Sequence, residues 1–181
     1  MRVIAGELRG RRLTAPRGSA TRPTADRVRE ALFSILGPFV EGARVLDLFA
    51  GSGAMAIEAL SRGALDATLV DSSSAAIATI RSNLSSLGIV AEVHRQTAAA
   101  YLQRASSAAR QYDLVFIDPP YRDASAFGSE LSSALRPVLA PGARVVAESD
   151  ARAPLELDQL TLLGERRYGD TMIGIYTHGS R

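Results

Sequence analysis

The spacing of the apolar residues changes near residue 43 of this chain. Before that point, residues 24–38 place apolar side chains at i, i+3, i+4, i+7 and i+8, namely Val28, Ala31, Leu32, Ile35 and Leu36. This spacing predicts an amphipathic helix, with Thr24 or Asp26 near its cap and Gly37–Pro38 as its stop.

Apolar strands and helices alternate from residue 43 onward. Strands are predicted at 43–49, 66–71, 89–95, 112–118 and 143–149, and helices at 54–63, 72–88, 97–108 and 124–139. Near-continuous apolar strands separated by helices indicate a parallel sheet with both faces covered. Residues 160–169 and 170–178 are two successive strand patterns, which predict a closing antiparallel hairpin. The predicted fold class is therefore α/β, with a mostly parallel seven-stranded sheet.

Positive charge is concentrated in the first 30 residues, although the whole chain carries only +2. Eight arginines stand there against three acids, so this segment is about +5 and the remainder about −3. Short apolar segments around Gly6 and Gly10 predict a small hairpin or extended arm. We therefore predict a basic arm at 1–23 and an α/β domain at 24–181. A basic arm favours a polyanionic partner, and the alternative is a solvated basic tail.

Several kinds of protein are disfavoured by the composition. The chain has no cysteine, so disulfides, thiolate metal sites and thiol nucleophiles are excluded. Its two histidines, His94 and His178, are far apart, and we expect no metal site. The first residues lack the apolar core of a secretion signal, and no apolar run approaches the roughly 20 residues of a membrane span. A cytoplasmic protein with no membrane partner is the expectation.

Three predicted strands end in residues that suit a ligand. The first is followed by a glycine-rich turn in DLFAGSG (47–53), the second ends in Asp71, and the fourth ends in DPPY (118–121). Ligands of such folds bind at the carboxyl ends of the strands, and an acid about 20 residues after the turn accepts hydrogen bonds from ribose hydroxyls. Alone, each has a structural alternative: a simple turn, a helix cap at Asp71, or a rigid strand exit. Their joint placement favours a site.

The glycine turn also fits the G-x-G-x-x-G/A pattern of dinucleotide-binding proteins, at residues 51–56. A nicotinamide cofactor is disfavoured by Asp47, four residues before Gly51, because a carboxylate gains nothing beside a pyrophosphate. A cofactor that carries an amino group and a sulfonium does gain from a carboxylate. S-adenosylmethionine has both, and it has a ribose for Asp71.

The residues of DPPY suit an exocyclic amine of a nucleobase, which is a poor nucleophile because its lone pair is delocalised. Asp118 offers a carboxylate, and Pro119 offers a carbonyl without a competing N–H. Acceptors on both N–H bonds favour a tetrahedral, more nucleophilic nitrogen. Pro120 stiffens the turn, and Tyr121 offers a face for stacking that is worth about 1–3 kcal/mol. The sequence therefore predicts methyl transfer to a base that is exposed or flipped out of its stack.

Longer blocks of the sequence resemble a known family. DLFAGSG is similar to the first motif of class I S-adenosylmethionine-dependent methyltransferases, and DPPY is similar to the motif of amino-methyltransferases. MRVIAGELRGRRL (1–13), TRPTADRVREALFSIL (21–36), DLFAGSGAMAIEALSRGA (47–64) and YGDT (168–171) together resemble the bacterial 16S rRNA (guanine(966)-N(2))-methyltransferase family, over residues 1 to about 178. The resemblance implies a Rossmann-like class I methyltransferase fold and methylation of the N2 amine of a guanine in 16S ribosomal RNA.

The resemblance also implies roles for particular residues. Asp118, Pro119, Pro120 and Tyr121 would hold the guanine amine, and the cofactor would be bound by Asp47, Phe49, Ala50, Gly51, Ser52, Gly53, Asp71 and Ser72. The arm would contact RNA through Arg9, Arg11, Arg12, Arg17, Arg22 and Arg27. The chain departs from the superfamily after the third strand, where Thr97 stands in place of Asp or Asn, so the adenine contact falls to Thr97 or Ala98.

Two other functions remain open at this stage. The same motif serves DNA adenine-N6 and protein glutamine methylation, although the basic arm disfavours a protein substrate. A non-catalytic RNA-binding or assembly factor is another class, which the intact DPPY and glycines disfavour. The expected partner is the small ribosomal subunit, and nothing in the sequence requires more than a monomer.

Overall fold

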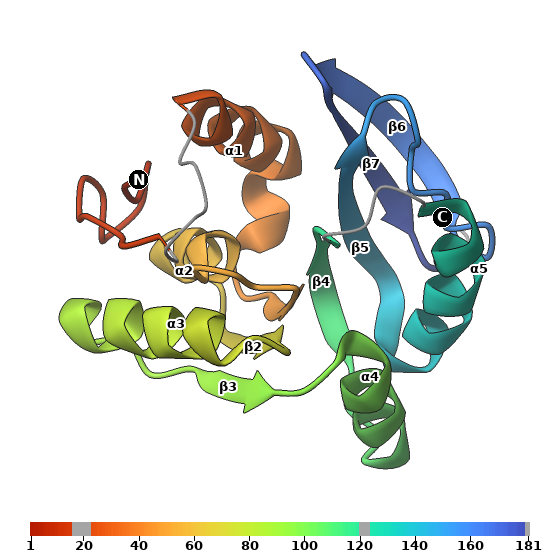
Figure 1. The fold of residues 1–181 in the computed structure, drawn as a ribbon, viewed down its shortest axis with the longest axis horizontal. Helices are drawn as coiled ribbons and strands as arrows, with labels where there is room; N and C mark the ends of the chain where they lie inside the picture. The colour runs from red at the N-terminus through yellow and green to blue at the C-terminus, as the bar shows by residue number, and fades with distance from the viewer. Residues whose placement is uncertain (16–22, 120–123, 180–181) are drawn as a thin grey trace.

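The computed structural model describes residues 1–15, 23–119 and 124–179. Its seven strands form one sheet in the order β3-β2-β1-β4-β5-β7-β6 (Figure 1). The strands are β1 (Arg44–Leu48), β2 (Asp66–Asp71), β3 (Glu92–Arg95), β4 (Tyr112–Ile117), β5 (Leu139–Asp150), β6 (Thr161–Tyr168) and β7 (Thr171–Thr177). The first five strands are parallel and the last two pair antiparallel, which confirms the predicted fold.

Helices cover both faces of the sheet. The helices α1 (Pro23–Leu36), α2 (Ala54–Ser61) and α3 (Ser74–Leu87) lie on one face, and α4 (Ala98–Ser107) and α5 (Ala124–Leu135) lie on the other (Figure 1). Side chains along β1 alternate between the two cores, because Val45 belongs to the α1–α3 core and Leu46 and Leu48 to the α4–α5 core. Short 3₁₀ helices follow α1 at Gly37–Val40 and α5 at Arg136–Val138.

Residues 1–14 turn back on themselves and pack against the α1–α3 core. Arg2 and Arg12 form an antiparallel bridge, and the Val3 N–H donates to the Arg11 carbonyl at 2.9 Å. Val3 and Leu13 are buried in the core that α1, α2 and α3 share. We call residues 1–14 the N-terminal hairpin. The proposed division of the chain at residue 23 stays a prediction.

Several predicted boundaries are wrong in detail: the helix expected over 124–139 ends at Leu135, and the strand expected from residue 143 begins at Leu139. The third strand was expected from residue 89, but β3 begins at Glu92. Ile89 instead completes the end of α3, because its N–H donates to the Leu84 carbonyl at 3.0 Å after Gly88 adopts the left-handed conformation. Among the described residues, no helix has the length and apolar character to cross a membrane.

Candidate active site

Four acids lie at the carboxyl ends of adjacent strands, and we call them the acidic edge: Asp71 on β2, Asp47 on β1, Asp118 after β4 and Glu148 on β5. Asp47 is paired with Leu69 and Phe116, and Phe116 is paired with Val146. Because side chains alternate along a strand, residues two positions later share the same face. All four acids therefore lie on the face of the sheet that α1, α2 and α3 cover.

The glycine turn after β1 has a backbone that restricts which residues fit. Gly53 has φ +78°, and an added Cβ would lie 2.8 Å from a methyl carbon of Leu69, so only glycine fits without a shift. Gly51 has φ +55°. Phe49 also has a positive φ, 64°, which is uncommon for an aromatic residue, and strained backbone of this kind clusters at active sites and ligand-binding turns. The turn leads directly into α2, whose first residue is Ala54.

Asp71 holds this turn in place. Its carboxylate accepts hydrogen bonds from the Gly51 N–H at 2.9 Å and from the Ser73 N–H at 2.8 Å. The sequence left a ribose contact and a helix cap as alternatives for Asp71. The structure contains the local contact at the start of α3, and since a carboxylate has about four acceptor positions, it also leaves capacity for a ligand. The neighbouring Ser72 is exposed.

Asp47 is buried, with only 4% of its surface exposed. Its carboxylate accepts one hydrogen bond, from the Ala56 N–H in the first turn of α2, at 3.2 Å. Burial is the main cause that raises the pKa of Asp47 to about 7, and the negative charges of Asp118 and Asp71 add to it. Among the described residues, Asp47 forms no ion pair that would neutralise its charge.

Asp118 follows β4 and reaches solvent, whereas the next residue, Pro119, is buried. Burial nevertheless raises the pKa of Asp118 to about 6, which fits a carboxylate open on one side and surrounded by protein on the others. Two residues before Asp118, the ring of Phe116 packs against Phe33 of α1 with 5.6 Å between centroids and anchors the end of β4. Such a contact contributes about 0.5–1.5 kcal/mol. The predicted site residues Pro120 and Tyr121 lie outside the described residues.

Glu148 is the member of the acidic edge that sequence reasoning missed. It is half-buried, and burial followed by the charge of Asp118 raises its pKa to about 7. A signal was available, because Glu148 interrupts a buried apolar strand near its carboxyl end, as Asp47 does. In the described part of the chain, the side chains of His, Cys, Asp and Glu do not gather into a group of three that could hold a metal ion.

In the structure Thr97 caps a helix, and the residue before it, Gln96, has a side chain that suits a ligand. The Thr97 hydroxyl accepts a hydrogen bond from the Ala100 N–H at 3.3 Å and so caps α4, and Ala98 is buried. Gln96 donates its backbone N–H to the Asp71 carbonyl at 3.1 Å. Its side-chain oxygen is buried and has no hydrogen-bond partner among the described residues. A buried acceptor of this kind beside Asp71 suits a ligand amine.

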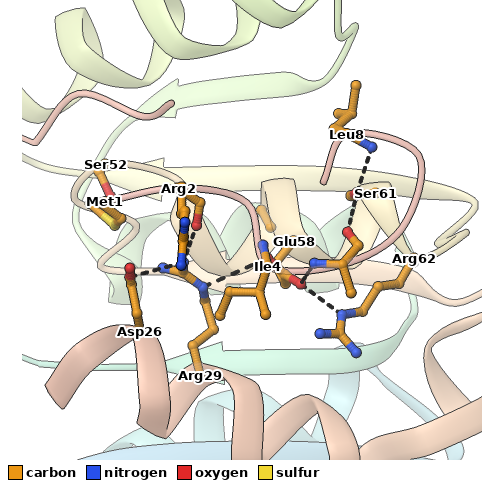
Figure 2. Close-up of polar contacts among 12 residues, drawn as sticks. Met1, Arg2, Ile4, Leu8, Asp26, Arg29, Ser52, Glu58, Ser61 and Arg62 are labelled. Atoms are coloured by element: carbon orange, nitrogen blue, oxygen red, sulfur yellow. Dashed lines mark hydrogen bonds and ion pairs between the residues drawn. The ribbon is translucent and has the colours of Figure 1, made fainter. Parts of the chain in front are cut away.

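A second carboxylate site lies beneath the N-terminal hairpin, and we call it the Glu58 cluster (Figure 2). Glu58 of α2 is fully buried and accepts hydrogen bonds from the Ile4 N–H at 2.8 Å and the Ala5 N–H at 3.0 Å. It also bonds Arg62 at 2.7 Å and pairs with Arg29 at 3.8 Å. Arg29 in turn donates to the Arg2 carbonyl and bonds Asp26 at 3.2 Å. This cluster joins the hairpin to α1 and α2.

The N-terminal hairpin also meets the glycine turn. The Asn83 side-chain amide of α3 donates to the Thr14 carbonyl and to the Ser52 carbonyl, each at 2.9 Å. The Ser52 hydroxyl lies 3.8 Å from the sulfur of Met1 (Figure 2). Hairpin and turn are therefore held in one arrangement.

The arginines predicted to contact RNA fall into two groups. Arg9, Arg11, Arg12 and Arg27 are exposed, and Arg11 donates to the Ser86 carbonyl at 3.1 Å. Arg17 and Arg22 lie outside the described residues. Arg29, which counted toward the charge of this segment, is buried and belongs to the Glu58 cluster.

The chain is similar in sequence and in structure to known proteins. The model of the family described as Conserved hypothetical protein 95 matches residues 1–177. The chain is 38% identical to YlbH of Bacillus subtilis, over 97% of this chain and 98% of that protein. It is 33% identical to the ribosomal RNA small subunit methyltransferase D of Haemophilus influenzae, over 97% and 93%. The solved structure of yhhF from Escherichia coli is 34% identical with a TM-score of 0.85, over 100% and 99%.

Proposed function

Because the chain belongs to the family described as Conserved hypothetical protein 95, we propose that it is an S-adenosylmethionine-dependent methyltransferase of ribosomal RNA. Its product is the N2-methylated form of a guanine, guanine 966 by family likeness, in the 16S RNA of the small subunit. The observation that carries this proposal is the acidic edge. Burial raises the pKa values of Asp47, Asp118 and Glu148, and the acidic edge has no cation partner among the described residues, which suits a positively charged cofactor and an amine substrate.

The residues present fit S-adenosylmethionine. The backbone of the glycine turn allows close approach, Asp47 lies beside it for the amino group, and Asp71 retains acceptor capacity for ribose hydroxyls. The unpartnered Gln96 oxygen suits the adenine amine, in place of the Thr97 contact expected from the sequence. When bound, the cofactor supplies an electrophilic methyl group on a sulfonium.

The role of the protein toward the guanine is to orient its amine and to stabilise charge. The Asp118 carboxylate accepts a hydrogen bond from one N–H of the N2 amine, and the Pro119 carbonyl accepts a hydrogen bond from the other. Positive charge that develops on the nitrogen is stabilised by the Asp118 carboxylate, which also takes up a proton as the methylated ammonium loses it. A strong base is unnecessary because that ammonium is acidic. Tyr121 gives the base a stacking surface.

The exposed arginines of the N-terminal hairpin support an RNA substrate. Arg9, Arg11 and Arg12 lie on a segment whose far side is anchored by the Glu58 cluster, so their charges are presented from a fixed backbone. Phosphate contacts of this kind give affinity without reading sequence. The name of the Haemophilus influenzae relative supports ribosomal RNA over DNA or protein.

The experiment is mass spectrometry of 16S RNA from cells that lack this protein and from the same cells supplied with it again. We expect one N2-methylguanine to be absent without the protein and restored with it. An unchanged modification pattern would contradict the proposal. Transfer of labelled methyl to small subunits, DNA and total protein then separates the alternatives, because adenine-N6 or glutamine methylation labels the other substrates and a non-catalytic assembly factor labels none.

A further inference from the structure

Glu148 is held at a fixed position beside Asp118. Ile117 of β4 pairs with Ala147 of β5, so the next residues along these parallel strands, Asp118 and Glu148, are neighbours. Adjacent strands lie about 4.8 Å apart, and paired residues point to the same face. On its other side, β5 pairs with β7, where Glu148 is opposite Ile173. Glu148 therefore stands in the interior of the sheet, next to the predicted catalytic acid.

No role within the fold accounts for this carboxylate. Among the described residues, Glu148 accepts no hydrogen bond and pairs with no cation. Burial and, after it, the nearby charge of Asp118 oppose its ionisation, so the arrangement costs stability in the protein alone. Groups that cost stability at the edge of a site are typical of ligand contacts.

The Watson–Crick edge of guanine carries two adjacent donors, the N1–H and the N2 amine. When Asp118 accepts a hydrogen bond from the N2 amine, an acceptor beside it faces the N1–H. Adenine differs at this place, because its N1 is a lone pair that a carboxylate repels. A second carboxylate next to Asp118 thus distinguishes guanine from adenine by the same physics that lets acidic side chains read base donors.

We propose that Glu148 is a specificity-determining residue, whose carboxylate accepts the N1–H of the target guanine while Asp118 accepts its N2 amine. This inference rests on the proposed function and extends it, since it names the group that selects guanine over adenine. It also gives the fifth strand a part in substrate recognition, which the sequence motifs assign to the fourth strand alone.

The test compares the wild-type protein with Glu148→Gln on two substrates. Small subunits are reconstituted with either guanine or 2-aminopurine at the target position, and kcat/KM is measured for each at a pH of about 8, above the pKa of about 7 of Glu148, so that its side chain is ionised. 2-Aminopurine keeps the N2 amine but has a lone pair at N1. We expect the wild-type protein to prefer guanine by roughly 10- to 100-fold, the effect of one charge-assisted hydrogen bond. The side-chain amide of the Glu148→Gln variant can donate an N–H to that lone pair, so its preference falls to within a few-fold of unity.

Controls separate this contact from other effects. 2-Aminopurine also lacks O6, but that loss is common to both proteins and cancels in the comparison of their preferences. Glu130→Gln makes the same chemical change at an exposed position of α5, and its preference stays at the wild-type value. Glu148→Asp, which keeps the charge but withdraws the carboxylate, lowers the preference as well, and it serves as the test if the Glu148→Gln variant does not fold.

The outcomes distinguish the two proposals. If the wild-type protein methylates guanine and Glu148→Gln keeps the full preference over 2-aminopurine, the role of Glu148 is overturned and the proposed function stands. If the wild-type protein transfers no methyl group to guanine N2 in these subunits, the proposed function itself is overturned, and the role of Glu148 with it.

Discussion

The Glu58 cluster and the acidic edge are both built from carboxylates packed against the same core, but their carboxylates differ in the number of hydrogen-bond donors and cations around them. Glu58 has two backbone N–H donors and two arginines around one carboxylate. At the acidic edge, buried Asp47 has a single backbone N–H, and Asp118 and Glu148 have no partner among the described residues. A carboxylate surrounded by donors and arginines stabilises the fold, whereas one with few or no donors around it is available to a ligand.

The contrast separates residues that fix the structure from residues that do chemistry. The Glu58 cluster ties the N-terminal hairpin to α1 and α2, and so positions the arginines that we expect to contact RNA. The acidic edge concentrates negative charge where a cationic cofactor and an amine are proposed to meet. Substitutions at the first site should therefore lower stability, and substitutions at the second should lower activity.

The largest effect on stability is expected for Glu58→Gln. Removing this charge leaves Arg29 and Arg62 without their buried partner, and breaking a buried ion pair costs about 3–5 kcal/mol. Chemical denaturation measures the change in the free energy of unfolding. Glu41→Gln, at an exposed position, is the matched control and should be neutral. A Glu58→Gln protein as stable as the wild type would remove the distinction between the two sites.

A smaller effect of opposite sign is expected for Asp47→Asn. The folded protein keeps a proton on Asp47 up to a pKa of about 7, while the unfolded chain releases it near 3.8, so the wild-type protein loses stability as pH rises through this window. Asparagine removes that penalty. We expect its stability advantage over the wild type to grow by about 2–3 kcal/mol between about pH 5 and pH 8, at 1.36 kcal/mol per pKa unit.

Asp113→Asn is the control for this pH dependence. Arg44 lowers the pKa of Asp113 through a hydrogen-bonded pair, so this group is ionised in both states across the same window. The Asp113→Asn replacement should lower the free energy of unfolding by the same amount at about pH 5 and at about pH 8. If Asp47→Asn behaves like Asp113→Asn, burial does not set the pKa of Asp47.

The smallest effect is expected on the salt dependence of RNA binding. Replacing Arg9, Arg11 and Arg12 by glutamine should reduce the slope of log K against log salt by about 2, since each phosphate contact contributes about 0.7–0.9. Filter binding over a range of salt concentrations measures it. The same change at Arg136, Arg166 and Arg167, which are exposed at other places, should leave the slope unaltered. Equal slopes for both triple variants would mean that the hairpin does not contact phosphates.

Much of the fold was predictable because it depends on short-range patterns. Near-continuous apolar runs located the strands, and the resemblance to a bacterial rRNA methyltransferase family is confirmed by the family match over residues 1–177. The start of β3 was predicted wrongly because Ile89 continues an apolar run while it bonds back to α3. The local sequence does not show which apolar residue after a helix forms a hydrogen bond back to its last turn.

The parts of the site that escaped sequence reasoning depend on contacts between distant segments. Glu148 joins the acidic edge only through the register of β4 and β5, about 30 residues apart in the chain. The Glu58 cluster needs the hairpin to fold onto α2, over a separation of 54 residues to Ile4. Gln96 was overlooked because its neighbour Thr97 had the more obvious hydroxyl, which the helix start uses instead.

The most direct test of the central claim is the single-turnover rate of methyl transfer by Asp118→Ala, at saturating cofactor and with small subunits as substrate. We predict a rate roughly 100- to 1,000-fold below that of the wild type, because the amine loses the carboxylate that orients it and stabilises its charge. Cofactor affinity, measured by calorimetry, should be retained, and Asp158→Ala at an exposed position should transfer methyl normally. Near wild-type transfer by Asp118→Ala would contradict the account.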